Sequence, residues 1–259
     1  MKNHISLFIF AIALLSGPVS ANDLSMTAVK DTLASIPGEH NYIYVRTPLG
    51  EDEEKNYDEI TFYDGLGREL DFAQSYGADR AGAIMAHHHL IEYDSLGRKE
   101  KQWLSTNTSF SYMSPEDLKG GVLWDYHDAG KRSYLQTNYE SSPLNRITEQ
   151  YGVGDAWGDH PARMEYLTNI PADSLRCSFY FIDDNDSLIR RGDYRSGELQ
   201  VTKATDEDGK PTYTFVDKQG RTLLTRLGRG NQQADTYFVF DRFGRIRYVL
   251  PPMLSLIHI

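Results

Sequence analysis

The sequence predicts an all-β fold of successive β-hairpins that form an extended, twisted or curled sheet with short helical or loop insertions. A five-residue core, Asp-x-x-Gly-Arg, occurs four times, at residues 64–68, 94–98, 217–221 and 241–245. An aromatic or β-branched residue precedes each copy. The 259 residues also include 17 Tyr and 11 Phe, which favour strands. Repetition of this kind predicts an array of similar units rather than one compact catalytic pocket.

Each copy of the core predicts a strand, a turn and a second strand. Residues 59–63 and 237–240, which precede the first and last copies, are rich in β-branched and aromatic side chains. The Asp side chain can accept a hydrogen bond from the backbone N–H two residues on, and the Gly can adopt a positive φ without steric cost. A type I turn closed by such a glycine is a common hairpin connection. We therefore expect a structural role for the Asp and for the Arg, which can pair with the turn Asp or with a neighbouring strand.

The other elements follow from composition and turn signals. We expect a first strand at 42–45, hairpins over 59–72 and 84–103, strands at 175–182, 199–203 and 212–216, and a hairpin turn at 207–209. Between them we expect a Gly/Ala-rich connection at 74–83, a long polar excursion at 105–121, a degenerate repeat at 128–131, a turn at 142–146 and a loop at 152–161.

The two ends of the chain carry segments outside the fold. Residues 1–21 read as a signal peptide, with Lys2, a short apolar run and a small-x-small cleavage pattern, so the mature chain is expected to begin at Asn22. The protein is therefore expected to be exported to the cell surface, secreted or held in the periplasm. Residues 254–259 read as a non-native tail, because they match a translated transposon end used in sequencing libraries. The β domain is expected over 22–253, and the natural chain is expected to continue.

Charge and cysteine content narrow the classes of partner. A formal charge of −10 argues against binding a nucleic-acid backbone, because no basic stripe is present to replace counterions. Cys177 is the one cysteine of the sequence, so no internal disulfide can form. Its strand-like surroundings favour a buried, unreactive thiol. No segment of the mature chain is expected to span a membrane.

Two polar clusters invite a metal-site interpretation. His87 and His89 would share one face of a strand and offer two imidazole ligands, but no further ligand lies at metal-site spacing. Residues 183–186 resemble a calcium loop but lack the sixth-position Gly and the closing Glu. Exposed strand residues and a turn are the favoured interpretations. We therefore assign no catalytic, cofactor-binding or metal-binding residue and expect no cofactor.

The repeats resemble the YD-repeat of bacterial RHS (rearrangement hotspot) proteins, named for the Tyr-Asp pair seen here at 63–64 and 93–94. Further segments, at 139–152 with Trp157, at 201–209 and at 240–252, are similar to a domain of unknown function near the N-terminus of Bacteroidetes RHS-repeat proteins. The resemblance extends over residues 40–253. It implies that more repeats follow and that the repeats wind into a β-sheet shell, often around a C-terminal toxin. The family assigns no catalytic residues to this region, so none is carried over.

The expected function is a non-enzymatic structural one. This chain would be the N-terminal region of a large exported RHS/YD-repeat protein acting in interbacterial competition, toxin delivery or adhesion, with the downstream repeats of the same polypeptide as its partner. The alternative is a stand-alone exported β module that binds a carbohydrate or a protein. An enzyme such as a glycosidase needs two carboxylates at the right separation, which the sequence neither shows nor excludes.

Overall fold

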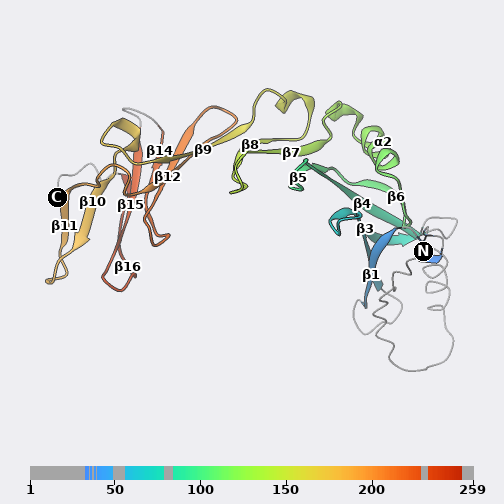
Figure 1. Ribbon diagram of the computed structural model, residues 1–259, viewed down its shortest axis with the longest axis horizontal. Coiled ribbons are helices and arrows are strands. Elements are labelled where there is room, and N and C mark those ends of the chain that lie inside the picture. Colours follow the sequence, from blue (N-terminus) through green and yellow to red (C-terminus); the bar gives the residue numbers. More distant parts are fainter. Residues whose placement is uncertain are drawn as a thin grey trace. The chain divides into compact units, whose positions relative to one another are not determined.

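The computed structural model (Figure 1) describes residues 33–34, 36, 38, 40–48, 56–78, 84–228 and 233–252. Its strands are β1 (Asn41–Pro48), β2 (Asn56–Tyr63), β3 (Glu69–Ala78), β4 (Ile84–Tyr93), β5 (Lys99–Trp103), β6 (Thr106–Ser109), β7 (Tyr134–Tyr139), β8 (Ile147–Tyr151), β9 (Ala162–Thr168), β10 (Ser178–Ile182), β11 (Leu188–Asp193), β12 (Gln200–Thr205), β13 (Pro211–Val216), β14 (Thr222–Leu227), β15 (Ala234–Phe240) and β16 (Ile246–Leu250). Its helical elements are α2 (Pro115–Asp125), η1 (His127–Ala129), η2 (Asp155–Trp157) and η3 (Asp173–Leu175).

The strands pair almost entirely in chain order. A 14-stranded sheet runs β1-β2-β3-β4-β5-β7-β8-β9-β12-β13-β14-β15-β16, and β6 adds to β4 beside this path. β10 and β11 form a separate hairpin. The registers of neighbouring strands are antiparallel, as expected for strands joined by short turns. The prediction of an all-β fold of successive hairpins in an open sheet is confirmed.

The chain divides into two compact units, which are described separately. Unit 1 comprises residues 1–136 and 152–155, and unit 2 comprises residues 137–151 and 156–259. The β domain predicted over 22–253 contains parts of both. Within the described residues, no helix is long and apolar enough to cross a membrane.

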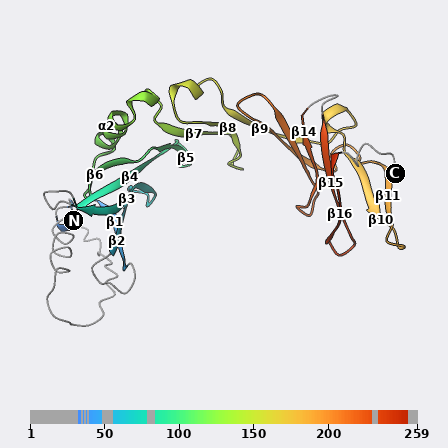
Figure 2. The same cartoon turned by 180° about the vertical axis from the view of Figure 1, so that it is seen from behind.

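Unit 1 has its core on one face of β2, β3 and β4. The inward side chains include Ile60, Phe62, Ala73 and Ala86, which alternate with more exposed neighbours as the two-residue period of a strand requires. Phe110 closes this core from the segment after β6. Helix α2 lies alongside β6 (Figure 2) and buries Leu118 and Val122.

Unit 2 has a larger core between its sheet and the segment that carries β10 and β11. Buried residues of the sheet include Val201, Phe215, Leu224 and Val239. The hairpin strand β10 faces β15, where the rings of Tyr180 and Tyr237 meet edge to face with centroids 4.9 Å apart. Aromatic packing of this kind stabilises the hairpin against the sheet.

The structure departs from the predicted elements at three places. The connection expected at 74–83 is partly strand, because β3 continues to Ala78 opposite β4. The polar excursion at 105–121 contains β6 and most of α2, which is capped by the Ser114 side chain accepting from the backbone N–H of Asp117 and begins at Pro115. The degenerate repeat expected at 128–131 is wrong, since these residues follow α2 and include the 3₁₀ turn η1.

Several sequence predictions fall on residues that the structure does not describe. The signal peptide at 1–21 and the apolar tail at 254–259 both lie outside the described residues.

The strands predicted at 42–45, 199–203 and 212–216 are confirmed as β1, β12 and β13. The predicted strand at 175–182 is confirmed from Ser178 onward as β10.

Candidate functional site

The four Asp-x-x-Gly-Arg turns share one hydrogen-bonded geometry. In the first turn, the Asp64 N–H donates to the Arg68 carbonyl at 2.9 Å, and the Gly67 N–H donates to the Asp64 carbonyl at 3.0 Å. The glycine has φ near +77°, a region that costs other residues energy. The three other turns repeat both bonds, with glycine φ values of 81°, 78° and 78°. The predicted tight turn closed by a left-handed glycine is confirmed.

The Asp side chain organises the turn on both of its oxygens. In the first copy, Oδ1 of Asp64 accepts from the backbone N–H groups of Leu66 and Arg68 at 2.8 and 2.9 Å. Oδ2 accepts from Nε of Arg68 at 2.8 Å. Partial burial raises the pKa of Asp64, but the hydrogen bonds from Arg68 and Leu66 outweigh this and hold its pKa below the usual value. The carboxylate therefore fixes the guanidinium in one orientation at the start of the next strand.

A fifth turn follows the same design with different residues. Glu140 takes the place of the Asp and accepts from Nε and Nη2 of Arg146, both at 2.7 Å. The Glu140 N–H donates to the Arg146 carbonyl at 2.9 Å, and Asn145 adopts the positive φ, 54°, that glycine adopts elsewhere. The predicted turn at 142–146 is thus a longer version of the repeat. The pattern Asp-x-x-Gly-Arg does not match it, because two of the three signature residues and the spacing differ.

Three of these arginines lie over an aromatic ring on the next strand. The guanidinium carbons of Arg68, Arg146 and Arg221 lie 4.4, 4.6 and 5.0 Å from the ring centroids of Tyr93, Tyr166 and Phe240. Such cation–π contacts stabilise by about 0.5–1 kcal/mol at exposed sites.

The strand register explains why these pairs form. Asp71 of β3 lies opposite Leu90 of β4, so the same register places Arg68 directly opposite Tyr93. The pairings of β8 with β9 and of β14 with β15 place the other two arginines opposite their rings in the same way. Each pair therefore joins one hairpin to the next across the sheet.

The last turn differs from the earlier ones. Arg245 is bound to Asp241 through Nε at 2.9 Å, as in the other copies. Its side chain is 70% exposed, whereas those of Arg68 and Arg221 are each 31% exposed. In the strand order of the described residues, β16 is hydrogen-bonded to β15 on one side and forms an outer edge of the sheet, where Ile246 and Val249 are exposed. An outer strand with unpaired backbone groups is a template for a further strand.

A groove of about 600 Å³ lies within unit 2 between the β10 strand and the sheet. Its lining includes the rings of Phe179, Tyr180, Phe240 and Phe243, together with Arg221. Aromatic walls with a few polar groups are typical of sites for small molecules or peptides. This groove is a candidate binding site of unit 2.

The three histidines occupy two faces of β4, as their alternation requires. His88 is buried, its Nδ1 2.7 Å from Oδ2 of Asp71 and its Nε2 3.0 Å from the Ser109 carbonyl. His87 and His89 lie on the opposite face, and burial lowers the pKa of His89. Among the residues that the structure describes, no group of three or more His, Cys, Asp or Glu side chains is placed to hold a metal ion. The burial of the middle histidine against an acid was not predicted, because the acid lies on another strand.

Residues 183–186 form the turn between β10 and β11, as the favoured interpretation predicted. Oδ1 of Asp183 accepts from the N–H groups of Asn185 and Ser187 at 3.0 and 2.8 Å. Asp186 adopts the positive φ, 63°, and its side chain forms an ion pair with Arg247. The acidic cluster thus copies the turn chemistry of the repeats.

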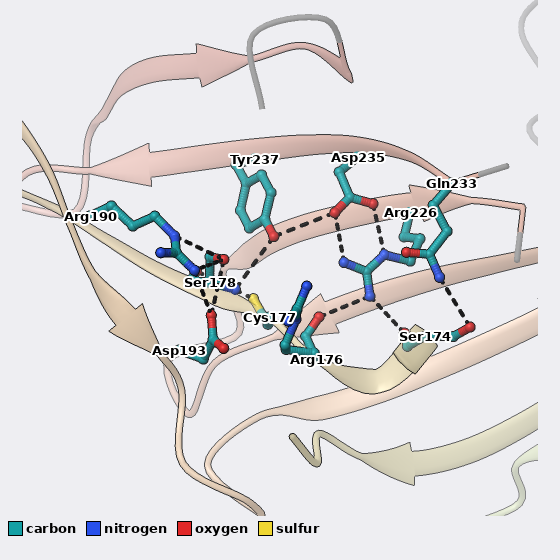
Figure 3. Close-up of polar contacts among 10 residues, drawn as sticks. All are labelled: Ser174, Arg176, Cys177, Ser178, Arg190, Asp193, Arg226, Gln233, Asp235 and Tyr237. Atoms are coloured by element: carbon teal, nitrogen blue, oxygen red, sulfur yellow. Dashed lines mark hydrogen bonds and ion pairs between the residues drawn. The ribbon is translucent and has the colours of Figure 1, made fainter. Parts of the chain in front are cut away.

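Sequence reasoning missed a buried ion pair in unit 2 (Figure 3). Nε and Nη2 of Arg226 donate to the two carboxylate oxygens of Asp235 at 2.7 and 2.6 Å. Nη1 donates to the carbonyls of Ser174 and Arg176 at 2.9 and 2.8 Å. Burial lowers the pKa of Arg226, but the hydrogen bond and charge of Asp235 outweigh this and raise it. The pair fastens the segment before β10 onto the sheet.

Cys177 lies in this segment and is 1% exposed. Burial raises the pKa of its thiol to about 12, against the opposing charge of Arg226 and with a smaller contribution from Asp235. A thiol is a poor nucleophile when it stays protonated. The prediction that Cys177 is buried is confirmed.

Comparisons with known proteins agree with this fold. Residues 41–168 match the family model described as "Domain of unknown function (DUF6443)". No curated protein matches the chain.

Three solved structures are similar. The crystal structure of TcdB2-TccC3-Cdc42 matches this chain with 15% sequence identity and a TM-score of 0.50. The match covers 83% of this chain and 10% of that chain. Those of TcdB2-TccC3 and TcdB2-TccC3-TEV are 14% and 13% identical with TM-scores of 0.48 and 0.47, over 83% and 90% of this chain and 10% and 11% of theirs. This chain thus spans about a tenth of the chains that it matches. The first of these structures thus shares the β-sheet fold described above.

Proposed function

We propose that this chain is a non-enzymatic structural region of a large exported RHS/YD-repeat protein, of the kind found in Bacteroidetes. Its role is to begin a β-sheet scaffold that further repeats of the same polypeptide extend. The observation that carries this proposal is the open outer edge at β16, which follows a hairpin built like the internal ones. The fold shared with TcdB2-TccC3-Cdc42 supports it.

The use of the repeated side chains supports a structural rather than a catalytic role. In each turn, Asp binds the Arg and the backbone of its own hairpin, as in Asp217 with Arg221 at 2.7 Å. In the buried pair of unit 1, both ring nitrogens of His88 face acceptors, Asp71 and the Ser109 carbonyl. A general base needs a free nitrogen within reach of its substrate. These groups are therefore better suited to holding strands together than to moving a proton.

Self-association tests the open edge. We expect the protein to associate as its concentration rises, because exposed β16 backbone groups can pair with another strand. Val249→Lys places a charge on this edge and should shift sedimentation velocity profiles toward the monomer. Leu66→Lys, at a turn tip that is 79% exposed, is the matched control and should leave association unchanged. A single monomeric species at every concentration would contradict the proposal.

Export is the second part of the proposal, based on the signal-peptide pattern of residues 1–21. The processed protein should be recovered outside the cytoplasm with Asn22 as its first residue, measured by mass spectrometry of the N-terminal peptide. Recovery of the unprocessed chain in the cytoplasm would overturn this part. Roles in interbacterial competition, toxin delivery or adhesion depend on export and on the repeats that follow.

The aromatic groove of unit 2 favours a second candidate, a module that binds a carbohydrate or a peptide. Phe179 lines the groove and packs edge to face on Tyr194 with centroids 4.9 Å apart. Aromatic faces in such a groove could stack on sugar rings or on apolar side chains. Saturable binding on a glycan array that Phe179→Ala abolishes, and that Phe72→Ala on β3 leaves intact, would support this candidate. Absence of binding to glycans and peptides would leave the scaffold as the function.

A further inference from the structure

The geometry points to Arg245 as a receptor for one aromatic side chain on a strand that adds to β16. This inference rests on the proposed function, because it needs the edge to accept a strand. It goes further by naming the residue that selects the strand and the side chain that the strand must carry. The occupant is an antiparallel strand with Tyr or Phe directly opposite Arg245, followed by a new Asp turn.

The internal repeats define the rule. In each of the three pairs formed by Arg68, Arg146 and Arg221, a carboxylate in the turn fixes the guanidinium. The ring then comes from the strand beyond, at the position directly opposite. The acid and the arginine are therefore supplied by one hairpin and the ring by the next.

The aromatic residue also stands in a fixed place in two of the three pairs. Tyr93 comes directly before Asp94, and Phe240 comes directly before Asp241. In these two copies, the residue before the repeat core thus contacts the arginine of the preceding hairpin and also starts its own turn. This gives the Tyr-Asp pair a physical reason to recur.

Arg245 has the first half of this arrangement, and within residues 33–252, as far as the structure describes them, no ring of a following strand lies opposite it. Asp241 binds its guanidinium through Nε and Nη2, each at 2.9 Å. Hydrogen bonds from the Arg245 backbone outweigh partial burial and lower the pKa of Asp241. Its carboxylate is therefore ionised and holds the guanidinium as in the internal copies. The guanidinium lies 5.1 Å from the ring of Phe243 in its own turn, and its side chain is 70% exposed.

Spacing gives the required register. Asp217 and Asp241, which begin the last two turns, are 24 residues apart, and Phe240 follows Arg221 by 19 residues. A strand that repeats this period would place its aromatic residue opposite Arg245. A tandem duplication of residues 229–252, inserted after Pro252 in the full chain, supplies such a strand.

The experiment measures hydrogen exchange of the β16 backbone amides in this duplicated chain. We expect the amides that point away from β15 to exchange at least about tenfold more slowly than in the parent chain, since strand pairing protects them. Replacing the copied Phe240 by Leu, or Arg245→Met, should each remove about threefold of that protection. The two changes together should cost no more than either alone, because they remove one contact. Arg242→Met, in the same turn, is the control and should change nothing.

The outcomes separate the inference from the proposed function. If β16 gains no protection, the edge does not accept a strand and both are overturned. If protection appears but is insensitive to Arg245→Met and to the loss of the copied ring, the scaffold proposal stands and the receptor role of Arg245 is overturned. The comparison is made at a concentration at which sedimentation shows both chains as monomers, because association through β16 would protect the same amides. Non-additive loss of protection supports the inference.

Discussion

The two units of this chain bury their charged groups in different ways. Unit 1 buries Asp71 against His88, whose Nδ1 can donate or accept according to the tautomer of the ring. Unit 2 buries Arg226, 4% exposed at its side chain, against Asp235, and an arginine keeps its charge throughout the accessible pH range. The imidazole can exchange a donor for an acceptor, whereas the guanidinium can only donate. The Arg226–Asp235 pair should therefore depend more strongly on its carboxylate than the His88–Asp71 pair does.

The largest effect that we predict comes from Asp235→Asn in unit 2. Arg226 donates to both carboxylate oxygens of Asp235, whereas the amide of asparagine has one acceptor and one donor group. The amide NH2 would therefore face an N–H group of Arg226. The guanidinium stays charged without its counterion, and breaking a buried pair in this way costs about 3–5 kcal/mol. Hydrogen exchange of β14 and β15 peptides, analysed as a local free energy of opening, should show this loss.

A smaller effect is expected from Asp71→Asn in unit 1. With its proton on Nε2, His88 can donate to the Ser109 carbonyl and accept at Nδ1 from the new amide, so both ring nitrogens keep a partner. We expect a loss of about 1–2 kcal/mol, the scale of a weakened hydrogen bond. Hydrogen exchange of β3 and β4 peptides measures it. Equal losses for Asp71→Asn and Asp235→Asn would show that the ability of the imidazole to exchange donor for acceptor does not matter.

These pairs also show what sequence reasoning captured and what it missed. The turns were predictable because Asp, Gly and Arg act within five residues, through local hydrogen bonds and one backbone conformation. The pairing of Arg226 with Asp235 depends on strand register, since the two lie opposite each other on β14 and β15. Register is a property of two strands together and is not written in either one.

The same distinction explains the other differences. Helix α2 was missed because the prediction weighted the polar residues and the glycines of 105–121 over the Ser114 cap and Pro115, which begin the helix. The Glu140 turn was missed because its acid is longer and its loop wider than in the repeat core. The outer edge at β16 was predicted in general, but the exposed guanidinium of Arg245 required coordinates.

Two glycines of unit 1, each in a repeat turn, should differ in how much stability is lost when alanine replaces them. Gly67 and Gly97 have φ values of +77° and +81°, so an alanine at either position is strained by about 1–2 kcal/mol. A Cβ at Gly97 would also lie 3.0 Å from Nη1 of Arg68, whereas one at Gly67 meets nothing within 4 Å. We therefore expect Gly97→Ala to destabilise unit 1 more than Gly67→Ala, measured by urea unfolding. Gly65→Ala, in open space without a positive φ, is the control.

The comparison of Gly97→Ala with Gly67→Ala also tests the contact between Arg68 and Tyr93, which links two hairpins. Arg68 is bound to Asp64 and lies over Tyr93, so it cannot move from the new methyl group without loosening one of these contacts. In a chain that already carries Arg68→Met, the difference between the two alanine variants should shrink toward zero. A difference that persists would mean that the Arg68 guanidinium is not the obstacle.

The smallest effect is expected at the Glu140 turn of unit 2, where the charged groups face solvent and are screened. Hydrogen bonds from the Arg146 side chain, then from Ser142, lower the pKa of Glu140 from 4.5 to about 2. Because the folded pKa is below that of the unfolded chain, the stabilisation is present above about pH 4.5 and is lost as the pH falls toward 2. A carbon-13 NMR titration of Glu140 should show its midpoint near 2, and Arg146→Gln should move it back toward 4.5. Arg163→Gln, which removes a guanidinium from β9 that binds Glu149 instead, should leave that midpoint unchanged. A midpoint near 4.5 in the unaltered protein would mean that acid and arginine do not hold this turn together, and the longer repeat would then depend on its backbone alone.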